Sequence, residues 1–288
     1  MTAIIFGASG QDGHYLSRLL DEAKIEWIGV SRSGNHFNTN IADYEEVAKL
    51  VSKYHPTYIF HLAASSTTSH SAWKENHETI STGSLNILEA AKEFSPSTRV
   101  FLAGSGLQFQ NNNQPIKESD PFEPKSIYAV ARIQSVYTAR YYRTLGLKVY
   151  VGYLFHHDSP LRTDDHVNKK IADTAKRIAK GSRETLAIGD LSVRKEFAFA
   201  GDIVTAIWKL VNQDKVWEAT IGTGKTYTIE EWVSCCFLLC GLNWKEHVES
   251  LPNFTAEYEM LVSDPSTIFS LGWRPAVSME ELAKMMMS

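Results

Sequence analysis

The chain has 288 residues, which is enough for one large or two coupled α/β lobes with a substantial buried core. Its 43% hydrophobic and 22% charged residues are typical of a globular protein, and a net charge of −4 gives no broad attraction for nucleic acid or anionic membranes. No apolar stretch is long enough to span a bilayer, and the apolar N-terminal run lacks the basic flank of a secretory signal. We therefore expect a cytoplasmic protein that binds its ligands, phosphorylated ones included, in a local site.

Strand-like and helix-like segments alternate through the first half of the chain. Short apolar runs predict strands at residues 2–6, 26–30, 58–62, 99–103 and 148–154. Helical spacing of apolar residues predicts helices at 14–23, 43–54, 79–93 and 127–145. Strands that are apolar on both faces, with helices between them, are typical of a parallel sheet covered on both sides. The sequence thus predicts an α/β fold with a Rossmann-type, doubly wound parallel sheet.

The pattern changes after about residue 155, where polar loops and helices at 167–179 and 202–211 dominate. We interpret residues 1–155 as a dinucleotide-binding domain and residues 156–288 as a smaller C-terminal lobe, mainly substrate-binding and entwined with the first. The three cysteines, Cys235, Cys236 and Cys240, have no further Cys or His cluster to complete a metal site. Packing of a core helix is therefore the favoured role for them, and we expect no metal.

A glycine-rich segment joins the first strand to the first helix. Its glycines permit a tight turn and a close backbone approach, and the helix N-terminus supplies free N–H groups and partial positive charge. This placement predicts a dinucleotide pyrophosphate site rather than a mere turn. The residues expected to form it are Gly7, Ser9, Gly10, Gln11, Asp12 and Gly13.

The end of the second strand indicates which dinucleotide binds. NAD-dependent enzymes place an acidic residue there for the ribose 2′-hydroxyl, whereas this strand is followed by Arg32. A guanidinium suits a 2′-phosphate, so NADP(H) is expected and NAD(H) is the less favoured cofactor; a solvated surface arginine is the alternative. We expect Asn40 and Ile41 at the adenine, and Ala63 and Ala64 near the ribose and phosphates.

The predicted helix at 127–145 carries Tyr128 and Arg132, which share a helix face at a spacing of four residues. A nearby cation stabilises a phenolate, and such a tyrosine can exchange a proton with a sugar hydroxyl while a hydride moves. Ser105 follows the fourth strand, at the edge where active sites of open α/β sheets form. Alone, a Tyr–Arg pair is more often a structural surface pair, but this context favours a catalytic set of Ser105, Tyr128 and Arg132.

The chain resembles the extended short-chain dehydrogenase/reductase superfamily and, within it, the GDP-mannose 4,6-dehydratase group. The resemblance rests on the glycine loop with its Gln-Asp-Gly ending, His61-Leu62-Ala63-Ala64, the block His157-Asp158-Ser159-Pro160, and Leu271-Gly272-Trp273-Arg274-Pro275. It implies a nucleotide-sugar substrate, and a homodimer or homotetramer formed through the Tyr128 helix. Further cofactor contacts implied by it are Leu62, Leu154, His157 and Arg162, beside Tyr128 and Arg132. Substrate contacts implied by it are Ser66, Ser105, Gly106, His156, Asp158, Val167, Lys170, Arg194 and Lys195.

The departures from this group fall on the chemistry. The family's lysine four residues after the tyrosine is Arg132, and its Thr-Ser-Glu triplet is Gly104-Ser105-Gly106. Glycine has no side chain for acid–base work, so we expect hydride transfer at C4 of a 4-keto nucleotide sugar, or the reverse oxidation. One alternative is a 4,6-dehydratase that recruits Asp120, Glu118 or Asp158 as its acid or base. Another is a non-catalytic NADP-binding sensor or scaffold.

Overall fold

The structure is a computed structural model that describes all residues except 33–35, 66, 165 and 253. Its described part contains a six-stranded sheet in the order β2-β1-β3-β4-β5-β10, with every neighbouring pair parallel. The strands are β1 (Thr2–Phe6), β2 (Glu26–Val30), β3 (Tyr58–His61), β4 (Arg99–Ser105), β5 (Lys148–Leu154) and β10 (Glu218–Ile221). Their apolar side chains are buried on both faces, as continuous runs of this kind require.

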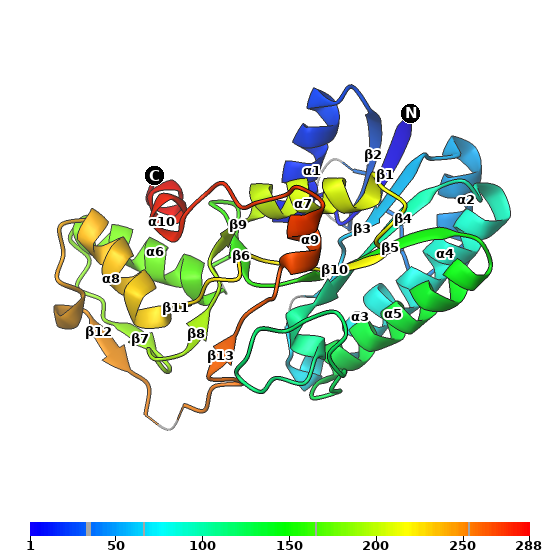
Figure 1. Ribbon diagram of the computed structural model, residues 1–288. Helices are drawn as coiled ribbons and strands as arrows, with labels where there is room; N and C mark the ends of the chain where they lie inside the picture. The colour runs from blue at the N-terminus through cyan, green and yellow to red at the C-terminus, as the bar shows by residue number, and fades with distance from the viewer. Residues whose placement is uncertain (33–35, 66, 165, 253) are drawn as a thin grey trace.

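Helices cover the two faces of the sheet (Figure 1). One face packs against α2 (Tyr44–Tyr54), α4 (Gly83–Phe94) and α5 (Ile127–Thr144), and the other against α1 (Gln11–Glu22) and α7 (Ala200–Val211). Each layer has its own buried apolar cluster, with Ile4 on one side of β1 and Ile5 on the other. The predicted doubly wound α/β fold is confirmed.

Two helix starts differ from the sequence expectation because tertiary contacts fix them. The first helix begins at Gln11 rather than residue 14, since Gln11 is buried and hydrogen-bonds to the backbone of His157. The third begins as α3 (Trp73–Asn76), continues as a π-helical segment (His77–Thr82) and then becomes α4. Buried Asn76 anchors that start by donating to the carbonyl of Thr67, at 3.0 Å.

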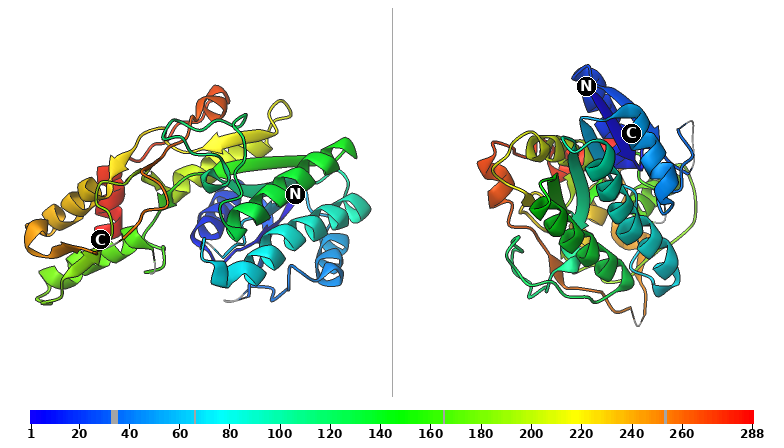
Figure 2. Two further views of the ribbon diagram at one scale, coloured as in Figure 1. Left: turned by 90° about the horizontal axis from the view of Figure 1, so that it is seen from below. Right: turned by 90° about the vertical axis from the view of Figure 1, so that its right-hand side faces the viewer.

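The chain after residue 155 contributes to both parts of the molecule. β10 and α7 belong to the sheet layer, whereas β9 (Ala198–Phe199) and β6 (His157–Asp158) pair in a separate two-stranded sheet. The rest forms the second lobe visible in Figure 2, around the helices α6 (Val167–Ala179), α8 (Ile229–Leu239) and α10 (Met279–Met287). Small ladders complete that lobe: β7 (Leu186–Ile188) with β12 (Val248–Ser250), and β8 (Arg194–Lys195) with β11 (Tyr227–Thr228) and β13 (Met260–Leu261). A short helix, α9 (Ser266–Ser270), packs beside β10.

Within the described ranges, no helix combines the length and hydropathy needed to cross a membrane. The same residues contain no group of three His, Cys, Asp or Glu side chains placed to hold a metal ion. The cysteines are unpaired, with Cys236 buried in the core of the second lobe. Tyr137 and Tyr141 are exposed on α5, where the sequence predicts contact between subunits, and that assembly stays a prediction.

Candidate active site at the carboxyl edge of the sheet

Three adjoining cavities follow the carboxyl edge of the parallel sheet. The first, of about 980 Å³, is lined by the β1–α1 turn, Arg32, Asn40 and Ile41. The second, of about 340 Å³, lies between Gly10, Gln11 and Arg162, and the third, of about 330 Å³, holds Ser105, Tyr128 and Arg132. Ala64 lines all three, so the cavities adjoin one another along a cavity path from the glycine turn to the predicted catalytic residues.

The glycine turn has the close packing that a pyrophosphate cradle needs. Gly7 has a φ of +95°, and a Cβ there would lie 2.7 Å from the backbone nitrogen of Ala63. A Cβ on Gly13 would lie 2.4 Å from the Gly7 carbonyl oxygen, so Gly13 lets α1 start directly behind the turn. The backbone therefore comes close to the cavity, and the first N–H groups of α1 have no partners within the helix. Gly13 itself supports the turn and does not line the three cavities.

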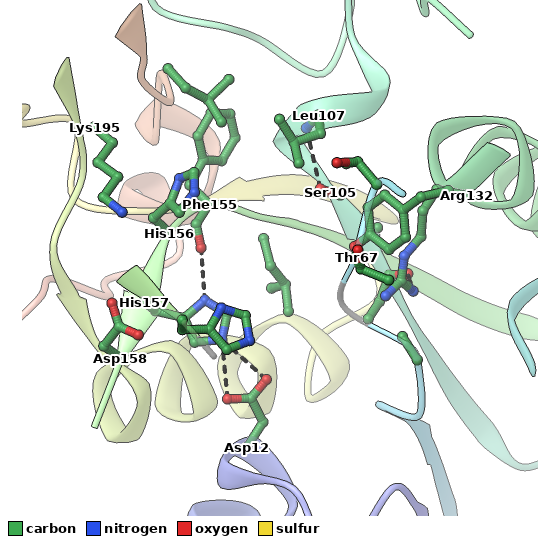
Figure 3. Close-up of a pocket in the computed structure, with 18 of the residues that line it drawn as sticks. Asp12, Thr67, Ser105, Leu107, Arg132, Phe155, His156, His157, Asp158 and Lys195 are labelled. Atoms are coloured by element: carbon green, nitrogen blue, oxygen red, sulfur yellow. Dashed lines mark hydrogen bonds and ion pairs between the residues drawn. The ribbon is translucent and has the colours of Figure 1, made fainter. Parts of the chain in front are cut away.

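Asp12 and His157 join the start of α1 to the segment after β5 (Figure 3). The His157 Nε2 lies 3.1 Å from both carboxylate oxygens of Asp12, and its Nδ1 lies 2.7 Å from the carbonyl oxygen of Phe155. Because both partners are acceptors, this geometry suits the protonated imidazole, in which both ring nitrogens donate. Burial alone would lower the pKa of His157, but the charge and hydrogen bond of Asp12 raise it. Burial likewise opposes ionisation of Asp12, yet His157 lowers its pKa below the usual range.

Gln11 adds a second connection at the same point. Its amide nitrogen donates to the His157 carbonyl at 3.2 Å, and its amide oxygen accepts from the hydroxyl of Ser159 at 3.0 Å. Asp12 and Gln11, which the sequence assigns to the cofactor, thus also hold the glycine turn against the second half of the chain.

Arg32 lies on the rim of the first cavity with 71% of its side chain exposed. Its Nη2 is 2.5 Å from the Oε1 of Glu75, a residue of α3 that the sequence analysis did not single out. The structure therefore places a carboxylate beside the arginine that was expected to select the cofactor.

Ser105 and Tyr128 meet in the third cavity, each more than nine-tenths buried. The Ser105 oxygen accepts a hydrogen bond from the Leu107 N–H at 3.2 Å, which leaves its hydroxyl hydrogen to donate to a ligand. In the part of the chain that the structure describes, no hydrogen bond holds the Tyr128 hydroxyl.

Arg132 packs against the ring of Tyr128 and makes no hydrogen bond with the Tyr128 hydroxyl group. The guanidinium carbon lies 5.2 Å from the centre of the Tyr128 ring, and Nη1 donates to the carbonyl of Ala103 at the end of β4. The Nε is buried with no partner among the described residues. Arg132 thus supplies a fixed positive charge beneath the tyrosine, held by the sheet itself.

The glycines on either side of Ser105 are packed against aromatic rings. A Cβ on Gly104 would lie 2.7 Å from the Cδ1 of Tyr153, and one on Gly106 would lie 2.8 Å from the Cε1 of Phe155. Threonine and glutamate side chains therefore have no room at these two positions unless the rings move. Gly106, predicted to contact substrate, lines a small cavity beside the third one instead.

The third cavity also holds a buried lysine. Lys195 at the end of β8 is 4% exposed and lines the cavity, and the described residues offer its ammonium group no hydrogen bond. Burial lowers its pKa to about 8. Beside it, burial and the charge of Lys195 keep the pKa of His156 well below its ordinary value, and the Tyr258 hydroxyl lies 3.1 Å from the His156 Nε2.

Asp158 lines the same cavity but is engaged by its neighbours. Its Oδ2 accepts from the Asn168 amide at 2.5 Å, and its Oδ1 pairs with the Nε of Arg162 at 3.4 Å. Val167 also lines this cavity, as do Leu154 and Leu62.

Several predicted residues lie elsewhere. Lys170 and Arg194 are exposed outside the three cavities, where Lys170 reaches the carbonyl of Ala187 and Arg194 bonds to Thr226. Both were predicted substrate contacts, and their direction on α6 and β8 turns them to solvent. Ser66 lies outside the described residues. The alternative acids Glu118 and Asp120 bond to Thr220 and to the Lys117 backbone, away from the three cavities.

Two kinds of cavity residue were not predicted from the sequence. Thr67, Thr68 and Glu257 line the third cavity, and the Thr68 hydroxyl donates to the Glu257 carboxylate. Thr67 and Thr68 could have been predicted from their place in the loop after β3, because loops at the carboxyl ends of parallel strands form the site in such folds. Glu257 has no local signal, since it approaches from the last part of the chain.

Doubly wound sheets that bring a serine and a tyrosine to a glycine-rich helix start define the short-chain dehydrogenase/reductase class, and this chain has that arrangement. A model of the family described as GDP-mannose 4,6 dehydratase matches residues 4–286. GDP-mannose 4,6 dehydratase 1 of Arabidopsis thaliana is 32% identical over 317 residues, covering 99% of this chain and 88% of that protein. The chain belongs to the GDP-mannose 4,6-dehydratase family, in the extended branch of the superfamily, as its motifs predicted.

Solved structures show the same fold at lower identity. The UDP-glucose 4-epimerase of Thermus thermophilus in complex with NAD has a TM-score of 0.86 at 21% identity, covering 100% of this chain and 98% of that one. RMD from Pseudomonas aeruginosa complexed with NADPH also has a TM-score of 0.86 at 21% identity, with 99% and 96% covered. The two structures hold different dinucleotides on one fold.

Proposed function

We propose that this protein is an NADP(H)-dependent enzyme that transfers hydride at C4 of a 4-keto nucleotide sugar, acting as a reductase or in the reverse direction as a dehydrogenase. The observation that carries the proposal is the surroundings of Ser105. Tyr128, as a proton donor, and Ser105, whose hydroxyl can donate a hydrogen bond to a ketone oxygen, both line the cavity there. Tyr153 and Phe155 fill the space beside Gly104 and Gly106, the positions at which the dehydratase group has threonine and glutamate.

The residues present suffice for reduction of a ketone. The Ser105 hydroxyl donates to the ketone oxygen, and the Tyr128 hydroxyl passes its proton to that oxygen as the C4–O bond becomes that of an alcohol. A bound reduced nicotinamide supplies the hydride for C4. The positive charge of Arg132 stabilises the phenolate that remains on Tyr128, which is then protonated again from solvent.

The two ends of the cavity path support the assignment of ligands. The glycine turn and the start of α1 suit a dinucleotide pyrophosphate, and Arg32 suits the 2′-phosphate of NADP. On the other side, Lys195 is a buried cation whose ammonium group has no hydrogen bond from the described residues. The charge of Asp158 acts on this ammonium group without a hydrogen bond to it, so Lys195 can still donate to an anionic ligand and suits the diphosphate of a nucleotide sugar.

The second candidate is the GDP-mannose 4,6-dehydratase reaction. Family membership favours it, and Glu257 brings one carboxylate to the third cavity besides Asp12 and Asp158, which are both ion-paired. Dehydration needs a base and an acid near C5 and C6 of the sugar, and Glu257 would have to supply them in place of the missing glutamate.

One pair of incubations separates the two candidates. The purified protein is mixed with NADPH and a 4-keto-6-deoxy GDP-sugar, or with GDP-mannose, while NADPH absorbance and product masses are followed. A reductase consumes NADPH in equal amount to the keto sugar that gains two hydrogens. Loss of water from GDP-mannose without net NADPH change would establish the dehydratase instead.

The role of Tyr128 is tested in the same assay. Tyr128→Phe removes the proton donor, and general acid catalysis is worth about 10²- to 10⁴-fold, so turnover is expected to fall by that factor. Tyr141→Phe, on the exposed side of the same helix, is the matched control and keeps wild-type turnover. Unchanged turnover of Tyr128→Phe would refute the assignment.

A further inference from the structure

The adenosine end of the cofactor path holds a cation and a carboxylate at one point. Arg32 lies two residues after the end of β2, where folds of this kind recognise the 2′ position of the adenosine ribose. Glu75 comes from α3, and its Oε1 lies 2.5 Å from the Arg32 Nη2. Both side chains line the same cavity as Gly7 and Gly10, so both reach the space where that ribose would lie.

These two groups recognise the two forms of the cofactor. A carboxylate at this place accepts a hydrogen bond from the ribose 2′-hydroxyl of NAD, and an arginine binds the 2′-phosphate of NADP. The sequence has only the arginine at the strand end, which favours NADP(H) over NAD(H). In the folded chain, Glu75 of α3 supplies a carboxylate at this place.

The Arg32–Glu75 ion pair is easily opened. Its side chains are 71% and 40% exposed, and exposed pairs of this kind contribute little to stability. A 2′-phosphate carries more negative charge than a carboxylate and offers more acceptor oxygens, so it can take Arg32 from Glu75. When the ribose carries a hydroxyl instead, Glu75 stays on Arg32 and still has lone pairs to accept from it.

A second ion pair on the same cavity provides a comparison. Lys74 and Glu78 also line it, with Nζ and Oε1 3.7 Å apart, one turn along the same helical segment. Removing Glu78 changes the charge of the cavity rim by the same amount as removing Glu75, without touching Arg32. Comparing the two substitutions therefore separates a change in the overall charge of the cavity from the loss of a direct contact with the ribose.

We infer that Arg32 and Glu75 together make this site accept both NADPH and NADH, with Arg32 binding the 2′-phosphate and Glu75 the 2′-hydroxyl. The inference deepens the proposed function and rests on its cofactor site. It adds Glu75 as the residue that determines the choice between the two dinucleotides.

The test is direct titration of the full chain with NADPH and NADH, without sugar, followed by nicotinamide fluorescence. The wild-type protein is expected to bind the two within about tenfold of each other, since each meets a charged partner. Glu75→Gln replaces the charged acceptor for the 2′-hydroxyl of NADH by a weaker, neutral amide oxygen, and it removes the anionic competitor for Arg32. The ratio of dissociation constants should therefore shift by about tenfold or more toward NADPH. Arg32→Ala shifts it toward NADH by a similar factor, and Glu78→Gln leaves it at the wild-type value.

The inference is overturned if wild-type protein binds NADPH but shows no NADH binding at a thousandfold higher concentration. It is also overturned if Glu75→Gln moves the ratio no further than Glu78→Gln does. In both cases NADPH binding stands, and the proposed function with it. Binding of neither dinucleotide would refute the proposed function and the inference together.

Discussion

Replacing His157 tests how the glycine turn is held in place. His157→Ala leaves the Asp12 carboxylate without its ion-pair partner. The pair is largely buried, because the side chain of Asp12 is 19% exposed and that of His157 is 11% exposed. At the observed 3.1 Å, the attraction is about 5 kcal/mol at an effective dielectric constant of about 20, before desolvation is subtracted. Breaking a buried pair by removing one partner costs about 3–5 kcal/mol, which is the expected loss in the free energy of unfolding.

The loss should depend on pH in a defined direction. His157 has a raised pKa in the folded protein, so its contribution is fully present below the unfolded value of 6.5 and is lost as pH rises through the folded pKa. Asp12 has a lowered pKa, so its contribution is present above the unfolded value of 3.8 and is lost as pH falls through the folded pKa. The pair therefore stabilises most between pH 3.8 and 6.5.

Urea unfolding at about pH 6 and about pH 9, followed by tryptophan fluorescence, measures the effect. The deficit of His157→Ala relative to wild type should be larger at the lower pH. His14→Ala, in the exposed part of α1, is the control and should change stability by less than about 0.5 kcal/mol. Equal deficits for His157→Ala at the two pH values would refute a charged pair at this place.

Two further predictions concern the reacting end of the site. Gly106→Ala places a Cβ 2.8 Å from the Phe155 ring, so overpacking should lower the free energy of unfolding in urea by about 1–3 kcal/mol. Phe155→Leu in the same chain should recover most of that loss. Wild-type stability of Gly106→Ala would show that the Phe155 ring moves aside without cost. Burial lowers the Lys195 pKa to about 8, so the ammonium charge is lost as pH rises through 8 and the KM for a nucleotide sugar should rise between about pH 7 and 9. Lys195→Ala should raise that KM about 10- to 100-fold and remove its pH dependence, whereas a flat wild-type profile would argue against a phosphate contact.

The sequence by itself determined the features that depend on short stretches of chain. The glycine turn, the five strands predicted in the first half and the Tyr128–Arg132 spacing follow from local backbone demands and from periodicity, and the structure has each of them. Even here, the start of α1 was set by a contact to His157 far along the chain. Local patterns therefore predicted the existence of elements better than their ends.

Only the tertiary structure decided which distant side chains share a cavity. Glu75 of α3 and Arg32 after β2 meet on the wall of one cavity, although they lie 43 residues apart in the chain. Lys195 lines the third cavity, while its neighbour Arg194 on the same strand, β8, is exposed. The crowding of Gly106 by Phe155 is likewise a contact between two strand ends. Such contacts depend on how packed elements are oriented, and a single residue along a strand reverses the direction of a side chain. The residue types of the site could thus be identified from the sequence, whereas their partners, and with them the selection of cofactor and reaction, depend on the packed fold.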